Sequence, residues 1–303
     1  MTDRTRRTFL GAALAGGAAC LNARRASAAP TEWPLGMFVN CGGDPDRALK
    51  QVADLGLGLC ELYTEEFDDD QATRLRKAME RHKVEVPVIF TMGPGPQSWD
   101  HKQGPPTNGL VPRPYRKQRV ERLKQASDFA RRCGIKKLET HCGYVPEDPN
   151  DPLYQETVTA LREVAEHCKR NGQTLLYHAG AETPVTMLRT IRDVGLDNQG
   201  IGLDTANGIM YGTGHPADAL EVYGHHVKTV NPKDANWPTD PIELGQEVPI
   251  GAGKGDFPRV LRKLRELNYH GPLIIEREIG GPQQIEDIRK AIVFLKGLMR
   301  GTG

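Results

Sequence analysis

One pattern recurs along this chain: a short apolar run ends in a polar residue, a turn follows, and an amphipathic helical stretch comes next. The apolar runs are nearly continuous in Leu, Ile and Val, which is typical of parallel strands covered on both faces. Strands are therefore predicted at Met37–Asn40, Gly58–Leu62, Glu85–Phe90, Lys137–His141, Thr174–His178, Ile201–Asp204, Val227–Asn231 and Leu273–Glu276.

The stretches between these strands have the 3.6-residue period of helices that bury one face. Their apolar stripes are Val158, Leu161, Val164 and Cys168; Phe257, Val260, Leu261, Leu264 and Leu267; and Ile285, Ile288, Ile292, Leu295 and Met299. Eight units in about 270 residues predict an α/β fold, a (β/α)8 (TIM) barrel, whose usual length is about 250 residues. The alternative is an open doubly wound sheet, but Asn40–Asp44 lacks the glycine spacing of a dinucleotide-binding turn.

Composition and charge narrow the function classes. The 303 residues are 38% hydrophobic and 26% charged, which excludes a disordered or coiled-coil chain. The formal net charge of +1 depends on residues 1–28, which hold five Arg and one Asp and so carry +4; the remainder is near −3. Because binding to nucleic-acid phosphates requires a basic face, we expect no nucleic-acid partner.

Cysteine spacing indicates neither a disulfide scaffold nor a structural zinc site. Beyond residue 28 the cysteines are Cys41, Cys60, Cys133, Cys142 and Cys168, without any CxxC pair. We expect most of them to be small buried apolar residues, with one bridge as the alternative in an oxidising compartment.

The first 28 residues are predicted to be a signal peptide. Arg6 and Arg7 are followed two residues later by Phe-Leu, and a run of small apolar residues continues to Leu21. Ala26–Ala28 then offers a small-residue cleavage site. The segment resembles a twin-arginine (Tat) signal, and this resemblance implies export of the folded protein to the periplasm.

Residues 29–303 are then predicted to form a single barrel domain. Lipidation at Cys20 is the weaker alternative to cleavage, because the large aliphatic residue usual three positions before a lipidated cysteine is absent. No other segment is long and apolar enough to span a bilayer, so we expect no membrane association after cleavage.

Polar residues end the predicted strands: Asn40, Glu61, Thr91, His141, His178, Asp204, Asn231 and Glu276. A carboxylate buried in a barrel costs several kcal/mol unless it is paired or bound to a metal. Acids and imidazoles at successive strand ends therefore predict one polar pocket, with a donor set suited to Mn, Co, Zn or Mg. The structural alternative for each residue alone is an ordinary hydrogen bond.

Two long connections follow predicted strands and would lie on the face of the barrel where sites form. They are Gly93–Pro114 and Ala235–Gly255, and their Trp99, His101 and Trp237 are candidates to cap a ligand. The glycine-rich stretch Gly251–Gly255 is interpreted as a tight turn rather than a phosphate cradle.

Five stretches carry a resemblance to a known family: His141–Asp148, His178–Thr183, Leu203–Asn207, Asn231–Ala235 and Ile274–Glu278. They resemble the xylose-isomerase-like sugar phosphate isomerase/epimerase barrels, which include the apurinic endonuclease relatives. The resemblance spans about Leu35 to Leu298. It implies the barrel fold and one divalent metal held at the ends of strands five to eight.

The residues of this chain match that ligand pattern in part. Asp204 and Glu276 match, whereas the strand-seven His of the family is Asn231 here and the strand-five Glu falls on His178. Lys233 and Asp234 of the strand-seven motif are intact, and Glu182 keeps the second acid of the strand-five motif. The resemblance thus implies a metal site of His178, Asp204, Glu276 and Asn231.

The leading hypothesis is a metal-dependent sugar isomerase or epimerase that abstracts a proton next to a carbonyl of a small carbohydrate. Glu276 and His178 are expected to share the acid–base work, and Lys233 to stabilise the oxyanion. The residues expected to contact the substrate are His141, Glu182, Asn207, Trp237 and Glu61. The alternatives are a keto-glycoside lyase and a metal-free sugar-binding barrel; an apurinic-site endonuclease ranks third.

Export can be tested directly. If Arg6 and Arg7 form the Tat signal, replacing both with Lys should retain the protein in the cytoplasm, because the paired arginines identify the substrate to that pathway. Cell fractionation measures the effect, and mass spectrometry should find a mature N-terminus near Ala29. Undiminished periplasmic delivery of the Lys-Lys variant would refute the assignment.

Overall fold

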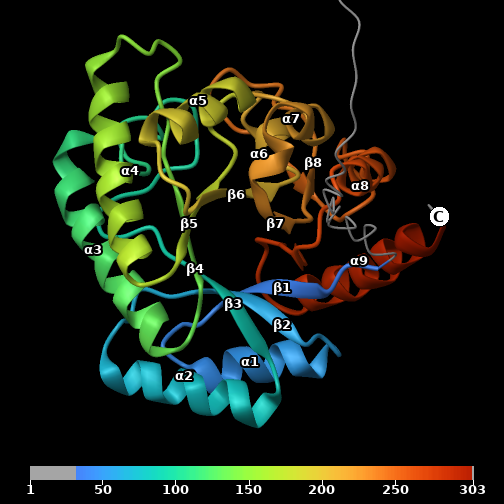
Figure 1. Ribbon diagram of the computed structural model, residues 1–303. Coiled ribbons are helices and arrows are strands. Elements are labelled where there is room, and N and C mark those ends of the chain that lie inside the picture. Colours follow the sequence, from blue (N-terminus) through green and yellow to red (C-terminus); the bar gives the residue numbers. More distant parts are fainter. Residues whose placement is uncertain (1–31, 302–303) are drawn as a thin grey trace, which may run out of the picture.

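Eight parallel strands close into a barrel in the computed structural model, which describes residues 32–301 (Figure 1). The strands are β1 (Leu35–Asn40), β2 (Leu59–Tyr63), β3 (Glu85–Phe90), β4 (Lys137–His141), β5 (Thr174–His178), β6 (Gln199–Asp204), β7 (Val227–Asn231) and β10 (Leu273–Ile275). Pairing of β10 with β1 closes the ring. The predicted (β/α)8 barrel is confirmed and the open sheet is excluded. The expected signal peptide lies outside the described residues.

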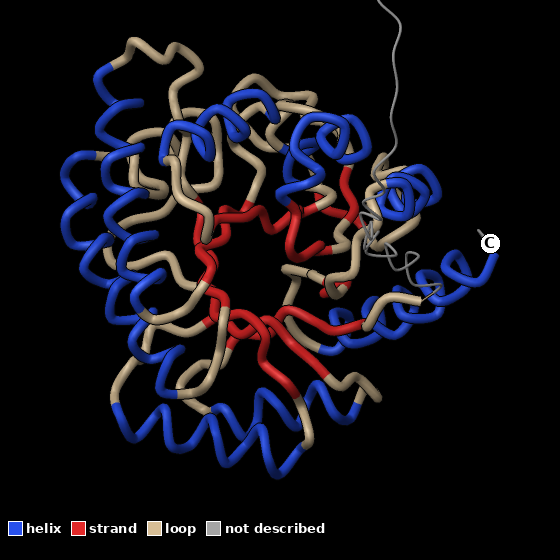
Figure 2. Tube along the Cα trace, in the orientation of Figure 1, coloured by secondary structure: helices blue, strands red, loops and turns tan. Residues whose placement is uncertain are grey.

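Helices surround the ring of strands (Figure 2). They are α1 (Pro45–Asp54), α2 (Asp69–His82), α3 (Arg113–Arg132), α4 (Pro152–Arg170), α5 (Pro184–Val194), α6 (Asn207–Met210), α7 (Pro216–Tyr223), the 3-10 helix η1 (Gly224–His226), α8 (Phe257–Glu266) and α9 (Pro282–Gly301). The predicted stripes of α4 and α8 are buried against the barrel, Leu267 beyond the end of α8 being half-buried. In the described chain, no helix combines the length and apolarity needed to cross a membrane.

Local sequence explains where several helices begin. Asp44 precedes Pro45, and its carboxylate accepts the backbone N–H of Arg47 at 3.1 Å. Asp151 precedes Pro152 in the same way. An Asp cap satisfies a free N–H of the first turn, and Pro at the first helical position has a φ already suited to the helix. These starts set where each strand-to-helix loop ends.

The five cysteines of the described chain are buried and free. The expectation of buried apolar cysteines is therefore confirmed, and the structure contains no bridge among them. Burial raises the pKa of Cys133 to about 11 and that of Cys168 to about 12, so both thiols stay protonated at neutral pH.

The two long loops meet above the barrel. The loop after β7 contains a short antiparallel pair that the sequence did not predict, β8 (Asp234–Ala235) with β9 (Glu247–Val248). The backbone N–H of His101, in the loop after β3, donates to the carbonyl of Ile242 at 2.8 Å. The two loops are thereby tied together over the carboxyl ends of the strands.

A buried arginine anchors the loop that follows β3. The guanidinium of Arg119, on α3, is fully buried and donates to four backbone carbonyls of that loop. Its acceptors are Pro94 (3.0 Å), Pro96 (2.9 Å), Thr107 (2.6 Å) and Gly109 (2.7 Å). Only the planar fork of an arginine reaches four separated acceptors at once.

Replacing this arginine should loosen the loop. We expect Arg119→Met to lower the free energy of unfolding by about 3 kcal/mol, because four buried carbonyls lose a charged donor. Denaturant unfolding measures the loss, and the fluorescence of Trp99 reports the loop. The matched control Arg131→Met, at an exposed position of the same helix, should stay within about 0.5 kcal/mol. Equal stability of the two variants would contradict the anchoring role.

Candidate active site

A cavity of about 300 Å³ opens at the carboxyl ends of the strands. One part of its wall is polar, with His141, His178, Asn207, Glu276 and Glu278. The remainder is largely apolar and aromatic, lined by Phe38, Tyr63, Phe90, Met92, Gln97, Trp99, Met210, Tyr211 and Leu244. Such a mixture of apolar walls and a few convergent polar groups is typical of a small-molecule site.

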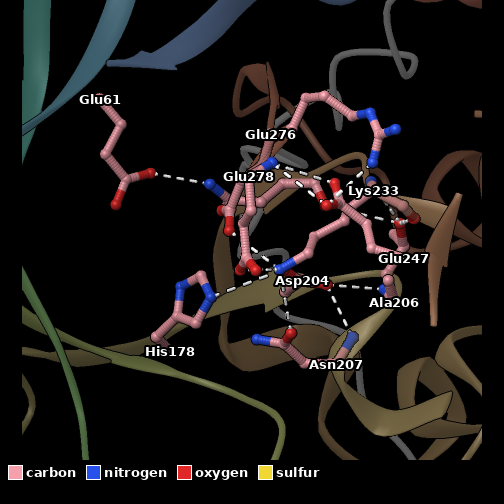
Figure 3. Close-up of polar contacts among 12 residues, drawn as sticks. Glu61, His178, Asp204, Ala206, Asn207, Lys233, Glu247, Glu276 and Glu278 are labelled. Atoms are coloured by element: carbon pink, nitrogen blue, oxygen red, sulfur yellow. Dashed lines mark hydrogen bonds and ion pairs between the residues drawn. The ribbon is translucent and has the colours of Figure 1, made fainter. Parts of the chain in front are cut away.

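The ammonium group of Lys233 lies at the centre of the polar cluster (Figure 3). Its Nζ is 3.2 Å from Glu276 Oε1 and 3.4 Å from Asp204 Oδ2, and it also pairs with Glu278. The side chain of Lys233 is only 1% exposed. A charge buried this deeply must be neutralised by groups in direct contact with it, and these three carboxylates neutralise it.

Asp204 is oriented by the chain that follows it. Its Oδ1 accepts the backbone N–H groups of Ala206 at 2.6 Å and Asn207 at 2.8 Å, whereas its Oδ2 has no hydrogen-bond partner. Burial alone would raise the pKa of Asp204, but the charge of Lys233 and the imidazole of His178 lower it to about 2. The carboxylate is therefore ionised throughout the neutral range.

Glu276 has a different environment from Asp204, although both carboxylates pair with Lys233. Burial raises the pKa of Glu276 to about 7, and the charge of Lys233 limits the rise. One of its oxygens, Oε2, has no hydrogen-bond partner. A carboxyl group that titrates near neutral pH can accept and return a proton, which is what an acid–base catalyst must do.

His178 joins β5 to this cluster. Its Nε2 lies 3.7 Å from Asp204 Oδ2, and its Nδ1 lies 2.7 Å from Glu139 Oε1. Burial disfavours the charged ring, but the contacts with Asp204 and Glu139 and the negative charges of Glu139 and Glu276 raise the pKa of His178 well above its ordinary value. The ring packs edge-on against Phe90, with the ring centroids 5.2 Å apart.

His141 forms the next part of the wall. Its ring centroid is 4.6 Å from that of His178 and 5.3 Å from that of Trp99. Desolvation, followed by the positive charges of His178 and Lys233, lowers the pKa of His141 well below its ordinary value. The imidazole is therefore neutral and can both donate and accept a hydrogen bond within the cavity.

Three side chains meet the requirements of a divalent-cation site. His178, Asp204 and Glu276 each offer one ligand atom, and these atoms all lie within 4.8 Å of one another. Asp204 Oδ2 and Glu276 Oε2 are buried acceptors without hydrogen-bond partners, as is Asn231 Oδ1. Hard and borderline divalent cations bind carboxylate oxygens and imidazole nitrogens, and these oxygens have no other partner. The predicted ligands therefore fit the metal that the sequence implied.

The structure places two of the predicted residues beneath or behind the cavity. Glu61 is fully buried inside the barrel, where its Oε2 accepts the Nδ2 of Asn231 at 2.9 Å and thereby orients that amide. Glu182 is buried beside a separate cavity of about 20 Å³, and neither of its oxygens has a partner. Burial raises the pKa of Glu182 to about 8. Neither residue lines the cavity of about 300 Å³, and their expected contact with a substrate stays a prediction.

Others of the predicted set lie further away. Trp237 is 41% exposed and does not line the cavity. The Oδ1 of Asn40 accepts the N–H of Gly42 in a turn, and Thr91 donates to Glu65. These two polar strand ends make local hydrogen bonds within the loops. The expectation that Trp237 contacts a ligand stays a prediction.

Some residues of the site escaped the sequence analysis. Glu139 precedes His141 by two positions and so faces the same side of β4, a period-two signal within Lys137–His141 that was available. Glu278 follows Glu276 by two positions in the same way but lies beyond the end of β10. Phe38, Tyr63 and Phe90 of the aromatic wall come from strands, and the apolar runs do not reveal the direction of their side chains. Trp99, a candidate from the loop after β3, does line the cavity.

Asp234 explains the glycine-rich loop. Its buried carboxylate accepts the backbone N–H groups of Ala235, Gly251, Gly253 and Gly255, each at 2.9 Å. A Cβ at Gly253 would lie 2.3 Å from Asp234 Oδ1, so only glycine fits there. The amides that a phosphate would use are already taken, which agrees with the interpretation of a tight turn.

Comparison with known proteins places this geometry in a family. The family model described as a xylose isomerase-like TIM barrel matches residues 49–298. An uncharacterized protein from Methanocaldococcus jannaschii is 27% identical over 194 residues. The match covers 60% of this chain and 62% of the length of that protein.

Solved structures agree. A xylose isomerase domain protein from Planctomyces limnophilus is 33% identical with a TM-score of 0.84, covering 89% of this chain and 98% of that one. A xylose isomerase-like TIM barrel protein from Mycobacterium smegmatis, in complex with magnesium, has 16% identity, a TM-score of 0.67 and coverages of 89% and 97%. A D-tagatose 3-epimerase-like protein has 20% identity, a TM-score of 0.69 and coverages of 88% and 98%. The last two show the fold alone, but with the family match and the first structure they lead to one conclusion: this chain belongs to the xylose isomerase-like TIM barrel family.

Proposed function

We propose that this protein is a divalent-metal-dependent sugar isomerase or epimerase that abstracts a proton next to a carbonyl group. The observation that carries the proposal is the buried triad of His178, Asp204 and Glu276, in which His178 and Glu276 line an aromatic-walled cavity and two carboxylate oxygens have no hydrogen-bond partner. Structures of this fold include proteins named D-psicose 3-epimerase and L-ribulose 3-epimerase, which supports the reaction class.

The residues divide the work by position and charge. His178, Asp204, Glu276 and Asn231 would hold the cation. When bound, such a cation polarises a carbonyl and its neighbouring hydroxyl and so stabilises an enediolate. Glu276, whose pKa burial raises to about 7, removes or returns the proton. Lys233 adds positive charge beside the developing oxyanion.

The cavity favours a neutral carbohydrate. Its charged lining residues include Glu276 and Glu278, which would repel a phosphate, and the loop amides nearby are occupied by Asp234. Aromatic faces such as those of Phe90 and Trp99 suit the apolar face of a sugar ring. The position of Lys233 between two acids also supports a second candidate, a sugar-binding barrel in which the ammonium group replaces the metal.

A substrate screen tests the reaction. The purified protein should be assayed with Mn, Co or Mg against free ketoses and against 3-keto-glycosides, the substrate of the keto-glycoside lyase alternative. Proton exchange with deuterated water at the carbon next to the carbonyl should appear with one substrate class and disappear in Glu276→Gln. Binding of sugars without any exchange would favour the sugar-binding barrel.

Metal removal should destabilise the fold. Asp204 Oδ2 and Glu276 Oε2 have no hydrogen-bond partner, and a cation bound to them would stabilise the folded state by mass action, by about 2.7 kcal/mol at a concentration 100-fold above Kd. We expect a chelator to lower the Tm of the native protein and to have no effect on Asp204→Ala.

The control for this experiment is Asp197→Ala, which removes an acid that is 81% exposed and pairs with Lys169. That variant should keep the full response to the chelator. Superimposable melting curves of the native protein with and without chelator would favour the metal-free alternative.

Metal affinity should rise with pH. Bound protons compete with the cation, since it binds the ionised carboxylate of Glu276 and a neutral nitrogen of His178. With the pKa of Glu276 at about 7, this residue alone predicts an affinity about tenfold higher at pH 8 than at pH 6. The raised pKa of His178 adds to the difference. Calorimetric titration with Mn at both pH values measures it, and a pH-independent Kd would exclude these residues as ligands.

A further inference from the structure

The imidazole of His178 contacts an acid on each of its two nitrogens. Nε2 faces Asp204 in the cavity, whereas Nδ1 lies 2.7 Å from Oε1 of Glu139, below the cavity floor. Glu139 comes from β4 and His178 from the neighbouring β5. Glu139 is not among the proposed ligands His178, Asp204 and Glu276; together with Glu61 and His178 it forms a second buried group whose potential ligand atoms lie within 4.8 Å of one another.

The barrel is shaped around the carboxylate of Glu139. The side chain is 0% exposed, and the hydroxyl of Thr229, on β7, lies 3.3 Å from its Oε2. On β6, Gly202 leaves the space that the carboxylate fills: a Cβ at that position would lie 1.8 Å from Glu139 Oε1. Three strands thus contribute to a built pocket for one buried acid.

This arrangement restricts the ring of His178. A carboxylate accepts but does not donate, so the hydrogen on Nδ1 must point toward Glu139. The ring is also held edge-on by Phe90 at 5.2 Å and by His141 at 4.6 Å between centroids. Nε2 is then the nitrogen of this ring that faces the cavity. The hydrogen bond between Nδ1 and Glu139 determines this orientation.

We propose that Glu139 is the positioning residue that keeps Nδ1 of His178 protonated and directs Nε2 toward Asp204 and Glu276. The effect of Glu139 on catalysis rests on the proposed function, whereas its effect on the protonation and orientation of the His178 ring does not. The proposal also gives Gly202 and Thr229 a purpose, since both hold the carboxylate rather than the imidazole.

Nuclear magnetic resonance of the ring nitrogens tests the proposal in chelator-treated protein labelled with 15N-histidine. The His178 signals are assigned by their loss in His178→Asn. The native protein should show a slowly exchanging, hydrogen-bonded proton on Nδ1 of His178. Glu139→Leu, which has a similar shape and no acceptor, should lose that proton signal, and Glu139→Gln should weaken it. A folded Glu139→Leu protein with the native signals would overturn the proposal.

Two further variants separate positioning from general damage. Gly202→Ala does not remove a polar group, but its methyl group would displace the carboxylate of Glu139 and should therefore weaken the same proton signal. Glu61→Gln removes a carboxyl group from the same interior and leaves the bond between Glu139 and His178 intact. It should keep the Nδ1 signal; loss of the signal in Glu61→Gln as well would refute a specific role for Glu139.

Manganese titration then relates the ring to the proposed function. Removal of a carboxylate behind a ligating histidine typically weakens metal affinity about 10- to 100-fold, and we expect this for Glu139→Gln. If the native protein binds no metal while Glu139→Leu still alters the ring, the proposed function fails and the positioning role stands. If the variant binds metal with the native affinity and keeps the native ring signals, the positioning role fails and the metal site stands.

Discussion

The charge of Lys233 determines how the mouth of this barrel is organised. A closed barrel excludes water from its interior, so a buried ammonium group is stable only with carboxylates in direct contact. Asp204 and Glu276 both lie within 3.4 Å of Lys233 Nζ. The same charge acts unequally on the two acids: it holds one ionised and leaves the other near neutrality, and this inequality is what acid–base chemistry requires.

The interior has two polar layers, and His178 connects them. One layer contains the proposed ligands His178, Asp204 and Glu276, and the other contains Glu61 and Glu139, which also lie close to His178. The ring of His178 is backed by the acid of Glu139, and Gly202 leaves the room that this acid fills. The orientation of His178 on β5 therefore depends on residues of β4 and β6 as well.

Sequence periodicity predicted the barrel because parallel strands in such a core are apolar on both faces; β4 and β5 begin and end where the pattern indicates. It also predicted Asp204 and Glu276, whose position at a strand end brings them to one mouth. Glu139 was missed since it lies within a strand, where a buried acid is unexpected. That Trp237 and Glu182 lie outside the lining of the larger cavity could not be predicted, because the path of a loop depends on tertiary contacts that periodicity does not contain.

The free cysteines have a consequence for how this protein matures. Thiol exchange and oxidation proceed through the thiolate and need access to it. In the described chain, burial both hides the five thiols and keeps their pKa values high. A barrel completed in a reducing cytosol would thus keep the same covalent connectivity after transfer to an oxidising compartment. No oxidant or isomerase has to act on these five cysteines, which suits the export of an already folded protein proposed from Arg6 and Arg7.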